Sequence, residues 1–184
     1  MRARAGVTLV ELAAVLAVVG VLAAVAVPYL LGTLPAFRVN AAARQLVGDF
    51  RLARTLAVDR NTDVLIQFHA PTANDYTLAL DTYPPPGGDH HITAEDEPVK
   101  VVRVAALYEG IEFTPSPGGG PPADGVTFTN DLANFNPDGH GVSGTVYVRP
   151  AADAGRTRSR ERRVTVDGST GRARIQRWTG SEWE

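Results

Sequence analysis

The chain has 184 residues, 44% of them hydrophobic and 21% charged, and its 20 acidic and 18 basic side chains give a net charge of −2. These values are typical of one folded domain with at most one appendage, and they exclude a collagen-like or wholly disordered chain. The chain has no cysteine, which excludes disulfides, thiolate zinc sites, iron–sulfur clusters and a cysteine nucleophile.

The N-terminus combines a short basic leader, residues 1–6, with a long uncharged run over residues 12–37. As a helix, this run of 26 residues would be about 39 Å long, enough to cross a hydrocarbon core of about 30 Å. It is too long for the apolar region of a secretory signal, and no signal-peptidase site follows it. Because Arg2 and Arg4 precede the run, the positive-inside rule predicts a cytoplasmic N-terminus and export of residues 38–184.

A single carboxylate, Glu11, lies at the start of the apolar run. A charge inside a membrane segment costs about 2.5–3.5 kcal/mol on insertion scales, so Glu11 is a candidate functional residue. The alternative is that Glu11 lies at the level of the lipid headgroups as a helix N-terminal acid, which the helix dipole favours.

The sequence Gly-Val-Thr-Leu-Val-Glu over residues 6–11, followed by an apolar helix, resembles the class III signal of type IV pilins and type II secretion pseudopilins. The resemblance implies that a prepilin peptidase cuts between Gly6 and Val7 and methylates the new amino group of Val7. It also implies that Gly20 and Pro28 loosen the helix, which both residue types are able to do.

The resemblance also implies a mechanism for Glu11. The carboxylate of one subunit would neutralise the cationic α-amino group of a neighbouring subunit in the core of a filament. Two charges buried as a pair cost less than either charge buried alone, so this contact would also set the register of assembly.

Residues 36–58 are expected to continue the helix as an amphipathic segment. The apolar positions recur at helical spacing and form one stripe: Val39, Ala42, Ala43, Leu46, Phe50, Ala53 and Ala57. Arginines 44, 51 and 54 lie off the stripe, on a face expected to be solvated. The sequence Asp-Arg-Asn at 59–61 should end the helix. We therefore predict one helix over residues 7–58, with residues 7–35 in the membrane.

Residues 59–184 have the short runs of β-branched and aromatic residues that indicate strands. The expected strands are residues 63–68, 76–80, 99–105, 111–114, 126–128, 145–148, 163–166 and 172–178. Residues 167–171, Asp-Gly-Ser-Thr-Gly, should form the turn of a hairpin. Two segments rich in proline and glycine, residues 83–96 and 115–125, are expected to be exposed loops.

A helix followed by strands predicts an α+β fold. Four short segments, residues 135–139, 144–148, 163–166 and 171–174, follow the order seen in the GspH/FimT group of minor pilin-like proteins. This resemblance implies a pilin-like fold, in which a long N-terminal transmembrane helix packs on an antiparallel two-sheet β head over residues 59–184.

The sequence predicts no enzyme, cofactor or metal site. Residues 139–144 match the dinucleotide pattern G-x-G-x-x-G only formally, because a strand and not a helix is expected after them. One loop holds residues of metal-ligating types without ligand spacing: Asp89, His90, His91, Glu95, Asp96 and Glu97. We expect the first segment to be a glycine-rich turn and the second to be a solvated acidic loop.

The charges of the head are divided along the chain. Residues 61–148 hold 12 acidic and 2 basic side chains, whereas residues 149–177 hold 3 acidic side chains and 9 arginines. Guanidinium groups make bidentate contacts with carboxylates and phosphates, so several of these arginines are candidate partner contacts: Arg156, Arg158, Arg160, Arg163, Arg172, Arg174 and Arg177. Residues 171–174, Gly-Arg-Ala-Arg, resemble the G-R-x-R element of the FimT branch, which takes part in DNA uptake.

Two functions are consistent with these features. The first is a GspH-type minor pseudopilin, a structural subunit of a type II secretion pseudopilus anchored in the bacterial inner membrane with its head in the periplasm. Its partners would be other pseudopilins and the prepilin peptidase. The second is a FimT-like minor type IV pilin that binds DNA through the arginine hairpin. In a third interpretation, the arginines are solvated or pair with the acidic part of the head.

Overall fold

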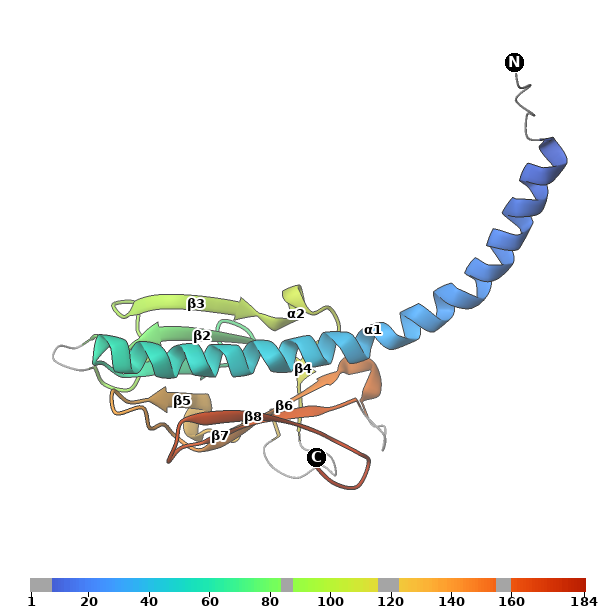
Figure 1. The fold of residues 1–184 in the computed structure, drawn as a ribbon. Coiled ribbons are helices and arrows are strands. Elements are labelled where there is room, and N and C mark those ends of the chain that lie inside the picture. Colours follow the sequence, from blue (N-terminus) through green and yellow to red (C-terminus); the bar gives the residue numbers. More distant parts are fainter. Residues whose placement is uncertain (1–7, 84–87, 116–122, 155–159) are drawn as a thin grey trace, which may run out of the picture. The chain divides into compact units, whose positions relative to one another are not determined.

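The computed structural model describes residues 8–83, 88–115, 123–154 and 160–184. The chain divides into two compact units, Met1–Leu34 and Pro35–Glu184. One helix, α1 (Leu9–Arg60), contributes to both units (Figure 1).

The described part of the first unit consists of the N-terminal half of α1. Its large apolar side chains are exposed, among them Leu9 at 84%, Val25 at 73% and Leu30 at 59%. The helix continues without interruption through Gly20 and Pro28. Within the described residues, α1 is the one helix long and apolar enough to cross a membrane, as the sequence predicted.

The second unit is an α+β head built from two four-stranded antiparallel sheets. The first sheet has the strand order β3 (Glu97–Arg103), β2 (Asp75–Leu80), β1 (Val64–Phe68) and β5 (Leu132–Phe135). The second has the order β4 (Ile111–Phe113), β6 (Gly144–Pro150), β7 (Arg162–Asp167) and β8 (Arg172–Arg177). Figure 1 shows β2 and β3 along one side of the C-terminal half of α1, with β7 and β8 along the other.

The core of the head forms around the predicted apolar stripe of α1. All seven stripe residues are buried, and they belong to one hydrophobic cluster with side chains from both sheets. Phe50, which has no exposed surface, lies at the centre of a ring cluster, with centroids 6.0–6.2 Å from those of Phe68, Phe128 and Phe135. The helix packed on two antiparallel sheets confirms the predicted fold class.

A buried acid on α1 links the helix to the first sheet. Asp49 is only 3% exposed, and its carboxylate accepts hydrogen bonds from Tyr76 Oη on β2, at 2.5 Å, and from Gln45 Nε2, at 2.9 Å. Lys100 Nζ on β3 lies 2.7 Å from Asp49 Oδ1 and neutralises its charge. Burial, together with the hydrogen bond to Asp49, raises the pKa of the Tyr76 phenol, so the phenol is a donor at neutral pH.

Two predicted strands differ from the structure, and one observed strand had not been predicted. Residues 126–128 do not form a strand, because only Val126 makes a bridge, to Val146, before the chain turns into a short 3-10 helix, η1 (Thr129–Asp131). Strand β5 was not predicted, since its four residues are too few for a clear alternation. Strand β3 begins and ends two residues earlier than expected, because the chain continues into a short helix, α2 (Val104–Leu107).

The end of α1 and the main turns lie close to where the sequence predicted them. Asn61 follows α1 with a φ of 51°, the left-handed conformation that ends many helices. Residues 168–171 join β7 and β8 as a hairpin turn. The turn expected at the glycine-rich segment 139–144 lies just before it, at residues 137–138. Gly141 bridges to Phe135, and the segment leads into β6 without a helix, as expected. A second 3-10 turn, η2 (Ala151–Asp153), follows β6.

We predict that Asp49→Ala lowers the free energy of unfolding of the head by about 3 kcal/mol, because it leaves Lys100 and the Tyr76 hydroxyl without their buried partner. The measurement is denaturant unfolding of the full chain in detergent, followed by the fluorescence of Trp178 and Trp183. Asp59→Ala, at a side chain 72% exposed on the same helix, is the control and should change the value by less than about 0.5 kcal/mol. Equal effects of the two substitutions would contradict the role assigned to Asp49.

Candidate functional site

The start of α1 forms a reciprocal hydrogen-bonded cap around Glu11. Glu11 Oε2 accepts hydrogen bonds from the backbone N of Thr8, at 2.8 Å, and from Thr8 Oγ1, at 2.9 Å. The backbone N of Glu11 donates in return to Thr8 Oγ1, at 3.2 Å. This is a capping box, a Thr-x-x-Glu pattern that the sequence analysis did not single out. Gly6 and Val7 lie outside the described residues.

Two of the predicted arginines face outward on the edge strand β8. Arg172 and Arg174 are exposed, and Ala173 between them is buried, as the alternation of a strand requires. Arg51, from the predicted solvated face of α1, joins them in lining a surface hollow together with Asp167, Thr170 and Ala173. The hollow is therefore lined by three arginines and one aspartate, from a helix and a hairpin far apart in the sequence.

Gly171 sets the position of this hairpin against α1. Its φ is +60°, and a Cβ built there would lie 2.5 Å from the carbonyl oxygen of Gly139 and 2.9 Å from Cδ of Arg54. Arg54 in turn donates from Nε to that same Gly139 oxygen, at 2.9 Å. The glycine of the Gly-Arg-Ala-Arg element is thus required by both its backbone conformation and its close packing.

The other predicted arginines are engaged within the head. Arg160 forms a bidentate ion pair with Asp153, with Nη2 at 2.7 Å from Oδ1 and Nε at 2.9 Å from Oδ2. Arg163 donates to Gln176 and lies with its guanidinium carbon 4.8 Å from the ring centroid of Trp183. Arg177 contacts Glu184 at 3.1 Å. Arg156 and Arg158 lie outside the described residues.

The expectation of a solvated acidic loop is wrong for Asp96. Its side chain is buried, and it accepts hydrogen bonds from the backbone N atoms of Thr82, Tyr83 and Thr93. Burial acts to raise the pKa of Asp96, but these hydrogen bonds outweigh it and hold the pKa below its ordinary value. Asp96 is therefore a buried anchor that fixes both ends of the loop.

Of the loop residues with metal-ligating side chains, His90 lies in a cluster with Asp63 and Asp81. Its Nδ1 is 3.3 Å from Asp63 Oδ2 and 3.8 Å from Asp81 Oδ2. Both carboxylates already accept hydrogen bonds. Asp81 accepts them from the backbone N atoms of Asp89 and His90, and Asp63 accepts one from Asn134 Nδ2. These hydrogen bonds account for the close approach of the three side chains without a metal ion.

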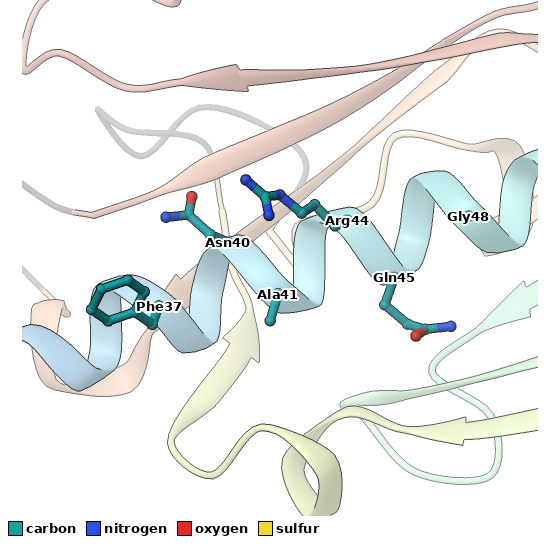
Figure 2. Close-up of a pocket in the computed structure, with 6 residues that line it drawn as sticks. All are labelled: Phe37, Asn40, Ala41, Arg44, Gln45 and Gly48. Atoms are coloured by element: carbon teal, nitrogen blue, oxygen red, sulfur yellow. The ribbon is translucent and has the colours of Figure 1, made fainter.

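A second hollow follows the exposed face of α1 within the head. It is lined by Phe37, Asn40, Ala41, Arg44, Gln45 and Gly48. Figure 2 shows Asn40 and Arg44 projecting from one side of the helix and Gln45 from the other. Asn40 Oδ1 accepts from Arg162 Nε, at 2.7 Å. The lining contains no carboxylate, imidazole or hydroxyl group able to act as a catalytic acid, base or nucleophile.

Residues 42–170 match a protein family described as type II transport protein GspH. No curated protein matches the chain. Several solved structures are similar to it. The minor pseudopilin EpsH from the type 2 secretion system of Vibrio cholerae is 13% identical, with a TM-score of 0.46 over 76% of this chain and 97% of that chain. A second structure of EpsH is 15% identical, with a TM-score of 0.47 over 75% and 92% of the two chains. The type IV minor pilin FimU of Pseudomonas aeruginosa is 13% identical, with a TM-score of 0.48 over 79% and 92%.

Proposed function

The chain belongs to the GspH family, and we propose that it is a minor pseudopilin, a structural subunit without catalytic activity in the pseudopilus of a type II secretion system. The observation that carries this proposal is the family match, which extends from the amphipathic half of α1 through most of the head. In this role the protein assembles with other pseudopilins and helps to move proteins across the outer membrane.

The exposed apolar half of α1 supports anchoring in the inner membrane. Burying these side chains in lipid or in a filament core removes a large apolar surface from water, which is favourable by about 25 cal/mol per Å². In the proposed topology, residues 1–6 are a leader, residues 7–35 span the membrane, and residues 36–58 and 59–184 lie in the periplasm. The prepilin peptidase cuts between Gly6 and Val7 and methylates Val7, while Gly20 and Pro28 loosen the helix during assembly.

The capping box supplies hydrogen bonds to the Glu11 carboxylate before assembly. In the single chain, Thr8 supplies the hydrogen bonds to the Glu11 carboxylate, so the carboxylate is already satisfied. Cleavage after Gly6 creates a cationic amino group at Val7, next to the cap. In the filament, the Glu11 carboxylate pairs with that amino group of a neighbouring subunit, which neutralises both charges where water is excluded.

We predict that Glu11→Ala is cleaved normally but is incorporated poorly into filaments, because the amino group of the neighbouring subunit then has no buried partner. Thr8→Ala is the matched control, since it removes the cap but keeps the carboxylate, and it should still be incorporated. The measurements are the mass of the mature chain and its recovery in the filament fraction. Normal incorporation of Glu11→Ala would contradict the proposed pairing.

A second candidate function, DNA binding as in a FimT-like minor pilin, is favoured by the hollow on β8. Three arginines, Arg51, Arg172 and Arg174, line the hollow, together with one acid, Asp167. Arginine clusters of this kind suit phosphate groups. In this alternative, the protein takes part in natural transformation and not in secretion.

If the alternative holds, the full chain in detergent binds duplex DNA at low salt, and Arg172→Ala/Arg174→Ala weakens binding. The plot of log affinity against log salt should then become shallower by up to about 1.8, because each phosphate contact contributes about 0.9. Arg44→Ala/Arg60→Ala removes the same charge outside the hollow and is the control. No binding by the unaltered chain at low salt, or equal losses in both variants, would exclude this alternative.

A further inference from the structure

Three metal-ligating side chains meet at one corner of the first sheet. His69 directly follows β1, Asp124 precedes the segment that bridges to β6, and Asp131 ends η1. One ligand atom from each of these residues lies within 4.8 Å of the others. The residues are up to 62 positions apart in the sequence, so no spacing rule could have grouped them.

The pairing of β1 with β5 brings two of these residues together. Gln67 is in register with Leu132, which places His69 just beyond one strand and Asp131 just before the other. Gln67 Nε2 also donates to the carbonyl oxygens of Asn130, at 3.0 Å, and of Asp131, at 3.3 Å. The corner is therefore fixed by the sheet and by a side chain of β1.

One ring nitrogen of His69, Nε2, lacks a hydrogen-bond partner among the described residues. Its Nδ1 is in hydrogen-bond contact with the backbone oxygen of Ala73. A carbonyl oxygen only accepts hydrogen bonds, so Nδ1 carries the proton and Nε2 of the neutral ring has a free lone pair. Among the described residues, Nε2 is buried and has no hydrogen-bond partner. Metal-binding histidines show this arrangement, in which the other ring nitrogen donates to a carbonyl or a carboxylate.

The two carboxylates at the corner also lack a cation. Asp131 is half-buried and Asp124 is exposed, and an oxygen of each lies within 4.8 Å of the other and of a His69 ring nitrogen. The backbone N of Val126 donates to Asp124 Oδ1, at 3.0 Å. Within the described part of the chain, no arginine or lysine forms an ion pair with either acid. One imidazole and two carboxylates thus converge where a positive charge would stabilise the two acids.

We propose that His69, Asp124 and Asp131 bind one divalent metal ion of the zinc class. One imidazole nitrogen and two carboxylate oxygens are ligands that Zn²⁺ accepts, with water as a fourth ligand. Bound metal would tie the loop after β1 to the segment 124–131 and stabilise this end of the head. The cluster of Asp63, Asp81 and His90 differs from this corner at its histidine. Asn134 Nδ2 lies 2.9 Å from His90 Nδ1, the nitrogen that faces the acids, whereas His69 Nε2 has no hydrogen-bond partner among the described residues.

The test is calorimetric titration of the EDTA-treated full chain, in detergent, with Zn²⁺. The expected result is one Zn²⁺ per chain, with affinity at least tenfold weaker in His69→Ala and in Asp131→Asn. His91→Ala, at a side chain 76% exposed outside the corner, is the matched control, and His90→Ala tests the other cluster. Both should bind Zn²⁺ as the unaltered chain does.

A second measurement on the unaltered chain does not depend on the folding of a variant. Co²⁺ added in place of Zn²⁺ should give visible d–d absorption bands that disappear when Zn²⁺ displaces it. Zinc should also raise the thermal midpoint of the unaltered chain, because a ligand that binds only the folded state stabilises it. The proposal is overturned if the unaltered chain does not bind Zn²⁺, if folded His69→Ala and Asp131→Asn bind it normally, or if only His90→Ala loses binding.

Discussion

The burial of one apolar stripe on α1 is the constraint on which the rest of the head depends. Phe50 and the six other stripe residues belong to one hydrophobic cluster with buried side chains of both four-stranded sheets. Without the helix, each sheet would expose one apolar face to water. The same helix continues as a segment whose apolar side chains are exposed, so one element links the core of the head to the part that needs a membrane or a filament.

The acidic and basic parts of the head have different uses. Several acids are buried and stabilise the fold. Asp49 accepts a hydrogen bond from Tyr76 and pairs with Lys100, and Asp96 accepts hydrogen bonds from the backbone of its loop. Arg149 pairs with Glu112 of the acidic part, as the third interpretation expected. Arg160 instead pairs with Asp153 of its own arginine-rich segment. Arg172 and Arg174 form no ion pair within the described residues and remain available to a partner. The arginines of residues 149–177 are therefore partly paired within the head and partly exposed on its surface.

The sequence predicted the features that depend on local pattern. The stripe of α1, the end of the helix near Asn61 and the hairpin at 168–171 follow from spacing and turn residues, and all agree with the structure. The features it missed depend on contacts between distant segments. Nothing in the sequence marked Asp49 as a core residue, because its partner Lys100 lies on β3. Arg51 reaches the hairpin only in the folded chain, and His69 meets Asp131 only through the pairing of β1 with β5.

The central claim, a structural role in secretion, is tested most directly by deleting the gene in its own host. Secreted proteins in the medium and the uptake of added DNA should be measured in parallel, with complementation by the unaltered gene. The account predicts that the secreted proteins accumulate inside the cells while transformation is unchanged. Normal secretion combined with a loss of transformation would contradict it and support the DNA-binding alternative.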